Sequence, residues 1–215
     1  MKNMRLAGAV LVAAAALLGS NAAASAQTIG FKVGPTWSKV HESGGSDDGD
    51  SYLQKIGGGG FVRFGMSGLS VQAEALAMTK GVKTVDGSDE ASLKLDYIEV
   101  PVLLRFGAGT LATASPYVMV GPSFGFKTSC KFEVKGSVNA SADCENNGTG
   151  FDLKTKSVDV GATGVVGLQF SAGPGALFVE GRYTHGLTKI NDDTSGDKAM
   201  NRTFAAMAGY SISLK

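Results

Sequence analysis

The chain has 215 residues, a length that fits one domain. Its 20 Lys and Arg against 19 Asp and Glu give a formal net charge of +1, so it lacks the basic excess of a nucleic-acid-binding protein. The 31 glycines favour strands over helices, because glycine costs about 1 kcal/mol in a helix interior.

The N-terminus has the features of a secretory signal. Lys2 and Arg5 precede an apolar run over 6–18, and small residues follow up to Ala24-Ser25-Ala26. A basic start, a short apolar core and an A-x-A site predict export through the Sec pathway with cleavage after Ala26. The apolar run is too short for a membrane-spanning helix, which needs about 20 residues. We therefore expect residues 1–26 to be a signal peptide and residues 27–215 to be the mature domain.

The rest of the chain alternates between apolar and polar residues. Eight segments show this period of two, at 28–37, 55–66, 69–80, 93–106, 115–127, 157–171, 176–188 and 202–215. Alternating segments of about ten residues are the signature of transmembrane strands. The pattern predicts an all-β protein, an eight-stranded antiparallel up-and-down β-barrel that spans a membrane with its apolar faces outward.

The links between these segments alternate in length. Those at 67–68, 107–114 and 172–175 are short, whereas those at 38–54, 81–92, 128–156 and 189–201 are longer and polar. Bacterial outer-membrane barrels have short periplasmic turns and longer external loops. We therefore expect the outer membrane of a bacterium as the location, with both termini on the periplasmic side.

Six charged residues fall on the faces expected to point inward. They are Arg63, Glu74, Glu99, Arg105, Glu180 and Arg182. An eight-stranded barrel is just wide enough for side chains to fill it, so we expect these charges to pair into one network. The alternative is that they line a narrow path for ions or solutes.

Two cysteines, Cys130 and Cys144, lie in the longest expected external loop. Exported proteins favour disulfides, so we expect one structural disulfide between them. A metal or redox pair would need the C-x-x-C spacing or nearby histidines, which this loop lacks. The acidic pairs Asp47-Asp48 and Asp192-Asp193 lack the ligand spacing of a calcium loop, and we expect no metal or cofactor.

The two histidines are candidate general bases of a lipid hydrolase embedded in the barrel. His41 lies in a polar loop and His185 lies near the rim on an outward face, and no G-x-S-x-G motif accompanies them. We therefore expect no catalytic residue. The enzyme alternative would require a Ser, a His and an acid to converge at the outer leaflet.

The chain resembles the PorT-like family of small outer-membrane β-barrels. The resemblance rests on L-D-Y-I-E-V-P-V-L-L-R-F at 95–106, on Pro116-Tyr117, Gly121-Pro122 and Gly125, and on G-Y-S-I-S-L-K at 209–215. It implies location and fold more than activity, since such folds carry many functions. The chain departs from many such barrels because it ends Leu214-Lys215 without an aromatic residue. Tyr210 and Leu214 are the candidate substitutes for recognition by the barrel-assembly machinery.

The sequence thus predicts a monomeric barrel in contact with outer-membrane lipids. Its expected role is non-enzymatic: envelope structure, surface contact or limited solute passage. The main alternative is a soluble periplasmic barrel that binds an apolar ligand inside. That alternative needs apolar residues inward, so an inward Glu99 and Arg105 would exclude it.

Overall fold

The structure, a computed structural model, describes residues 27–42, 50–66, 68–86, 89–107, 113–136, 139–144, 157–188 and 199–214. Several sequence predictions concern residues outside these ranges: the signal peptide 1–26, Asp47, Asp48, Asp192, Asp193 and Lys215. The side chain of His41 is likewise outside what is described.

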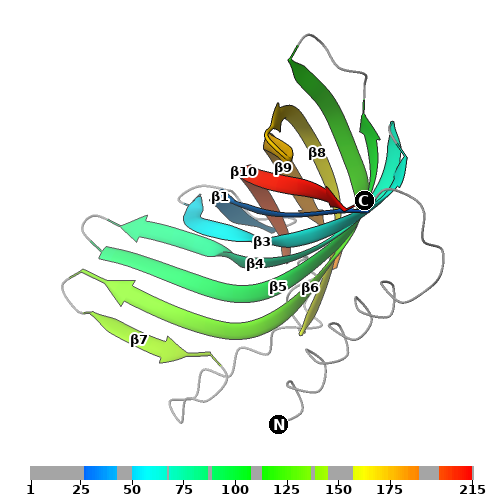
Figure 1. The fold of residues 1–215 in the computed structure, drawn as a ribbon. Coiled ribbons are helices and arrows are strands. Elements are labelled where there is room, and N and C mark those ends of the chain that lie inside the picture. The colour runs from blue at the N-terminus through cyan, green and yellow to red at the C-terminus, as the bar shows by residue number, and fades with distance from the viewer. Residues whose placement is uncertain are drawn as a thin grey trace.

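The described residues form strands that close into a barrel (Figure 1). The strands are β1 (Gln27–Glu42), β2 (Asp50–Ser51), β3 (Leu53–Met66), β4 (Leu69–Asp86), β5 (Asp89–Gly107), β6 (Ala114–Lys135), β7 (Ala140–Asp143), β8 (Val158–Ala172), β9 (Gly175–Gly186) and β10 (Ala199–Leu214). Eight long strands pair in the order β1-β3-β4-β5-β6-β8-β9-β10, always antiparallel, and β10 pairs with β1. The short strands β2 and β7 add to β4 and β6. The predicted eight-stranded antiparallel barrel is confirmed. Among the described residues, no helix is long and apolar enough to cross a membrane.

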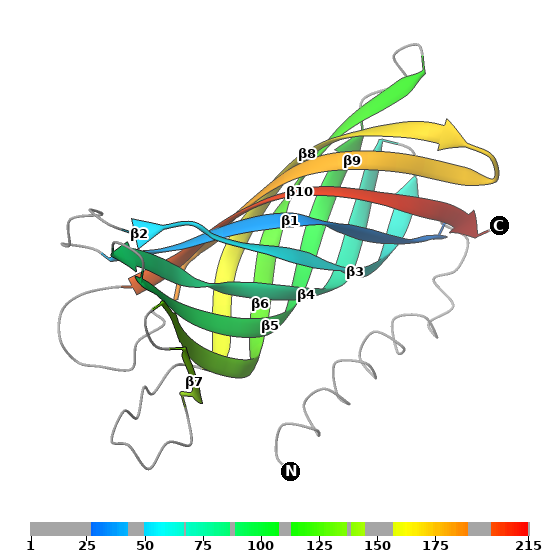
Figure 2. The ribbon, with the colours of Figure 1, turned by 90° about the vertical axis from the view of Figure 1, so that its left-hand side faces the viewer.

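The two ends of the barrel differ (Figure 2). At the end that we call the short-turn end, Gly68 and Gly173 close tight turns in the left-handed region, with φ of 101° and 61°. Glycine adopts these angles without a steric penalty, which explains why the turns can be so short. Gln27 pairs with Leu214 at the same end. The opposite end, which we call the long-loop end, carries β2 and β7.

At the long-loop end the strands extend further than the sequence predicts. The expected loop 81–92 is largely a hairpin, because β4 and β5 stay paired up to Asp86 and Asp89. Similarly, β6 continues to Lys135 and pairs with β7. Backbone hydrogen bonds extend a strand whatever its side chains, so strands continue beyond the region where one face must be apolar.

The expected faces hold along the eight long strands. Outward residues such as Ile56, Phe31 and Val166 are 76, 60 and 63% exposed, whereas the inward Lys32 and Glu99 are buried. One irregularity, in β6, changes which residues of that strand face inward. Asp96 pairs with Ser129 and Tyr97 with Lys127, so Thr128 is an extra residue in β6. Such a bulge turns the following residues to the other face, and Cys130 is therefore buried.

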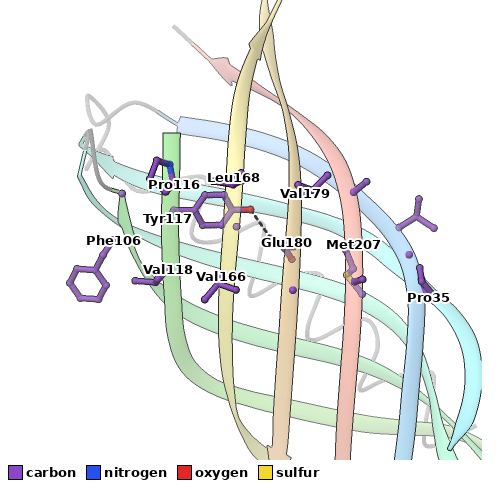
Figure 3. A pocket seen from close by; sticks show the side chains of 17 residues that line it. Pro35, Phe106, Pro116, Tyr117, Val118, Val166, Leu168, Val179, Glu180 and Met207 are labelled. Atoms are coloured by element: carbon purple, nitrogen blue, oxygen red, sulfur yellow. Dashed lines mark hydrogen bonds between the residues drawn. The ribbon is translucent and has the colours of Figure 1, made fainter. Parts of the chain in front are cut away.

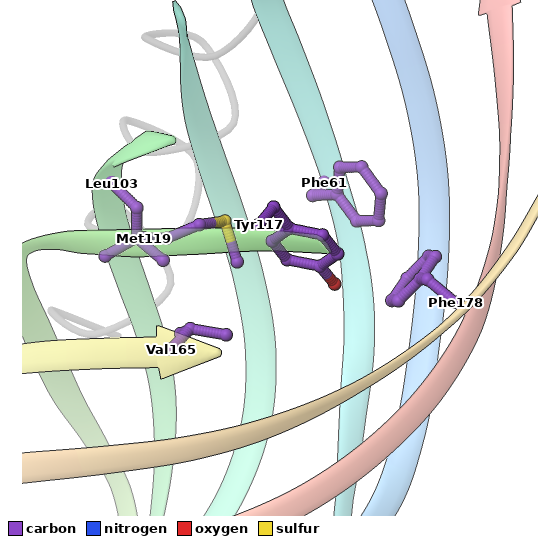
Figure 4. Packing of buried hydrophobic residues seen from close by; sticks show 6 residues of the cluster. All are labelled: Phe61, Leu103, Tyr117, Met119, Val165 and Phe178. Atoms are coloured by element: carbon purple, nitrogen blue, oxygen red, sulfur yellow. The ribbon is translucent and has the colours of Figure 1, made fainter. Parts of the chain in front are cut away.

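An apolar cluster fills the barrel near the short-turn end (Figure 4). It comprises Phe61, Leu103, Tyr117, Met119, Val165 and Phe178. The rings of Phe61 and Phe178 meet edge to face with centroids 5.7 Å apart. Tyr117 lies across Gly167 of β8, where an added Cβ would come within 2.3 Å of the Tyr117 ring. Glycine at this position lets the aromatic ring fill the interior.

Candidate functional site

Four charged side chains meet in the middle of the barrel, and we call them the central charge cluster: Lys32, Glu74, Glu180 and Arg182. The Lys32 Nζ lies 2.9 Å from Glu74 Oε1 and 2.6 Å from Glu180 Oε1. Arg182 also contacts the carboxylates of Glu74 and Glu180. All four side chains are at most 1% exposed. Two cations face two anions, so the cluster is neutral and each buried charge is paired, as burial requires.

Neutral groups complete this cluster from the short-turn side. The Tyr117 hydroxyl donates to Glu180 Oε2 at 3.0 Å, across strand β8 (Figure 3). The Gln72 amide donates to Glu74 Oε1 at 2.7 Å. The Lys32 ammonium lies 5.2 Å from the Phe61 ring centroid and 5.6 Å from that of Phe178. The cluster thus packs directly against the apolar cluster, and together they fill this cross-section of the barrel.

A second cluster lies nearer the long-loop end, and we call Lys80, Glu99 and Asp159 the outer charge cluster. The Lys80 Nζ lies 2.9 Å from Glu99 Oε2 and 3.5 Å from Asp159 Oδ2. Ser123 donates to Glu99 at 2.8 Å, and Asn201 donates to Asp159 at 3.0 Å. Lys80 carries one positive charge against the two carboxylates. The hydroxyl and amide donors stabilise the remaining negative charge.

The structure therefore divides the six predicted interior charges into three groups. Glu74, Glu180 and Arg182 lie in the central charge cluster, and Glu99 lies in the outer one. Arg63 and Arg105 lie at the short-turn end, where each donates to a neutral group. Arg63 donates to the Thr28 hydroxyl at 3.3 Å, and Arg105 donates to Gln169 Oε1 at 3.0 Å.

The predicted charge network left out three interior charges: Lys32, Lys80 and Asp159. The alternation places Lys32 and Asp159 on inward faces, and Lys80 shares the inward parity of Glu74, so all three belong in the network. The predicted set was already balanced, with three arginines against three glutamates. Because this set needed no further charge, it gave no reason to add Lys32 and Lys80, which are the partners of Glu74 and Glu99.

The predicted disulfide between Cys130 and Cys144 is present. The prediction that both cysteines lie in an external loop was wrong. Cys130 belongs to β6 and Cys144 directly follows β7, and both are buried against Leu95 and Tyr97 inside the barrel. The disulfide therefore anchors the β6–β7 hairpin to the interior packing at the long-loop end.

Removing this disulfide is expected to lower the free energy of unfolding by about 3 kcal/mol, the value for a loop of this size in the chain-entropy model. Chemical denaturation of the Cys130→Ser/Cys144→Ser double variant and of the reduced parent protein would measure the loss. The two should agree. A reduced protein as stable as the oxidised one would contradict the expected role as a clip.

His185 lies on the outer face of β9, as expected. Its Nδ1 is 3.3 Å from the Tyr183 hydroxyl. Within the described ranges, no group of three His, Cys, Asp or Glu side chains is arranged to hold a metal ion.

A sequence profile of the family described as "Outer membrane protein beta-barrel domain" matches residues 21–192. The chain belongs to this family. It is an integral β-barrel of the bacterial outer membrane. A sequence comparison with curated proteins gives no match.

Solved structures of outer-membrane barrels resemble the chain in fold. Neisserial surface protein A has a TM-score of 0.51 at 12% identity, covering 86% of this chain and 97% of its own. OprG from Pseudomonas aeruginosa (TM-score 0.45, 12% identity) and the protease OmpT from Escherichia coli (0.46, 10%) each cover 88% of this chain and 97% of their own. At such identities the likeness shows the fold alone.

Membership of this outer-membrane family explains why the outer wall of the barrel is apolar. Exposed valine, leucine, isoleucine and phenylalanine side chains face lipid, while Glu99 is 0% exposed inside. A soluble barrel with an apolar interior is thereby excluded, because it needs the reverse arrangement. A hollow of about 1020 Å³ on this wall is lined by residues such as Val118, Val166 and Val179 (Figure 3). It faces the hydrocarbon of the bilayer.

Proposed function

We propose that this outer-membrane barrel is closed and non-enzymatic, and that it acts by surface contact at its long-loop end. The observation that carries the proposal is the packed interior. The central charge cluster joins β1, β4 and β9 through buried ion pairs, and the apolar cluster fills the adjoining section. Opening a path would separate buried pairs, which costs about 3–5 kcal/mol for each charge left alone.

The long-loop end offers the surface for such contact. Paired charges lie along the extended ends of β4, β5 and β6, with Lys83 Nζ 2.7 Å from Glu90 Oε2 and Lys94 in contact with Glu133. The hydrogen bond from Lys83 holds the pKa of Glu90 below its usual range. These charges are partly exposed, so they contribute little to stability and remain available to a partner.

The proposal includes an orientation. The long-loop end faces the exterior and the short-turn end, with both termini, faces the periplasm. Secretion by the Sec pathway, insertion as a monomer by the barrel-assembly machinery and PorT-like family membership belong to the same proposal. Three links support the orientation, since 43–49, 144–157 and 187–198 lie at the long-loop end, whereas the two-residue links 67–68 and 173–174 lie at the short-turn end.

Planar-bilayer recordings test the closed state. The folded protein, verified by its altered gel mobility when unboiled, is expected to give no steady current, because paired side chains fill its interior. A porin refolded in parallel serves as the positive control. Steady channel currents from the folded form would contradict the proposal and favour solute passage.

Epitope insertion tests the orientation. A tag at 87–88, in the β4–β5 link, should bind antibody on intact cells, whereas a tag at Gly173, in the β8–β9 turn, should not. Both tags should bind antibody after the outer membrane is permeabilised. The reverse labelling would overturn the orientation and move the contact surface to the periplasm.

The proposal of a non-enzymatic role is supported by the position of His185 on the outer face of β9, where its Nδ1 lies 3.3 Å from the Tyr183 hydroxyl. Ester hydrolysis by the folded protein in lipid micelles is expected to stay at the level of a His185→Ala variant. Activity that the substitution abolishes would overturn the non-enzymatic role.

A further inference from the structure

Three basic side chains form a row across the outer wall near the long-loop end, and we call them the basic row. Lys39 of β1 pairs with Arg202 of β10, which in turn pairs with His185 of β9. Directly paired residues of neighbouring strands share a face, so Lys39 and Arg202 lie on the outer face with His185. The described outward positions of β1, β8, β9 and β10 hold no Asp or Glu. The basic row therefore gives this part of the wall a positive charge.

A row of aromatic side chains lies next to the basic row, on the side of the membrane centre. Trp37 pairs with Phe204, and Phe204 pairs with Tyr183. The Phe204 and Tyr183 ring centroids are 4.7 Å apart. The Tyr183 hydroxyl points towards the basic row, 3.3 Å from His185 Nδ1. Aromatic girdles mark the interface of the bilayer, so the basic row lies at the level of the lipid headgroups.

The wall is hollowed on the other side of the aromatic row. Trp37, Gly164 and Gly181 help to line a hollow of about 500 Å³. Gly181 and Val166 also line the hollow of about 1020 Å³ described above, so the two adjoin and continue towards the short-turn end (Figure 3). Small side chains create this space, since a Cβ added to Gly164 would meet no atom within 4 Å. An apolar hollow that begins beneath the headgroup level matches an acyl chain.

We propose that the basic row and the two hollows bind one phosphorylated glycolipid of the outer leaflet, its phosphate on Arg202 and Lys39 and an acyl chain in the hollows. Arginine presents a planar fork of donors that matches phosphate oxygens. The Nε of Arg202 has no hydrogen-bond partner among the described residues, so this side chain gains a hydrogen bond when it turns to a phosphate. The identity of the lipid rests on the orientation proposed above, in which the long-loop end faces the exterior.

Native mass spectrometry of the folded barrel, released from maltoside micelles that contain purified diphosphoryl lipid A, tests this site. One lipid A should stay bound per chain. Arg202→Gln and Gly164→Leu should each weaken binding by about tenfold, because the first removes a charged donor and the second fills the hollow. An altered gel mobility of each unboiled variant verifies its fold.

Two substitutions outside the site are matched controls. Lys131→Gln removes an exposed cation near the long-loop end of β6. Gly60→Leu adds a side chain to the outer face of β3, where an added Cβ would have its nearest neighbour at 3.6 Å. Neither should change the affinity for lipid A. Equal weakening by the controls and by the site variants would overturn the site, because it would indicate unspecific attraction to the wall.

Competition on the unmodified protein tests the identity of the occupant, even if a variant cannot be refolded. Excess phosphatidylglycerol should not displace lipid A. Displacement would overturn the glycolipid in favour of any anionic phospholipid, and dimers that lipid A does not dissociate would make the wall a contact between two copies. Absence of bound lipid A would refute the proposal. Binding in micelles does not depend on the orientation in cells, so this failure is distinct from reversed epitope labelling.

Discussion

Glu74→Ala is expected to lower the free energy of unfolding of the barrel by about 3–5 kcal/mol, the cost of leaving buried charges without their partner. Glu74 accepts from both Lys32 and Arg182, and none of the three side chains is more than 1% exposed. Its removal leaves the cluster with two cations against Glu180 alone. Urea unfolding in lipid vesicles, followed by the fluorescence of Trp37, the single tryptophan, would measure the loss.

Two controls isolate the effect of the unpaired charge. Glu133→Ala breaks the partly exposed pair with Lys94 and should change stability little, since water and salt screen it. Replacing Lys32 and Glu74 together with methionine leaves Arg182 paired with Glu180, so the double variant should be clearly more stable than Glu74→Ala. If Glu74→Ala and Glu133→Ala were equally mild, the central charge cluster would not hold the barrel together.

Val166→Arg is expected to destabilise the barrel in lipid vesicles by about 2–4 kcal/mol, the cost of an arginine on the lipid face at mid-depth. Val166 lies near the middle of β8 with its side chain 63% exposed. In a water-soluble barrel such an exposed position would accept arginine at almost no cost. The same urea titration in vesicles therefore measures a property that only a membrane-spanning wall confers.

Leu187→Arg is the matched control for this substitution. Leu187 is 59% exposed, similar to Val166, but it follows the end of β9 on the long-loop side. Its replacement should cost about 0–1 kcal/mol, because the penalty falls towards the membrane interface. Equal costs at the two positions would contradict the placement of Val166 in the hydrocarbon region.

The limits of the sequence prediction lie at the strand ends and at one bulge. The period of two ends where lipid no longer requires an apolar face, so β4, β5 and β6 were expected to be shorter than they are. Thr128 adds one residue to β6, and no local signal distinguishes it from its neighbours. The predicted position of the disulfide, in an external loop, was therefore wrong, although the predicted pairing of Cys130 with Cys144 was correct.

By itself, the sequence determined the number of long strands and the face on which residues such as Val166 and Glu99 lie. It could do so because side chains alternate along every strand and lipid accepts only apolar groups. The tertiary structure decided which inward charges meet. Lys32 contacts Glu180, 148 residues away, while Arg63 and Arg105 line one small cavity at the short-turn end. Such contacts cross the interior of the barrel and depend on the closure and stagger of all eight strands, which no local pattern specifies.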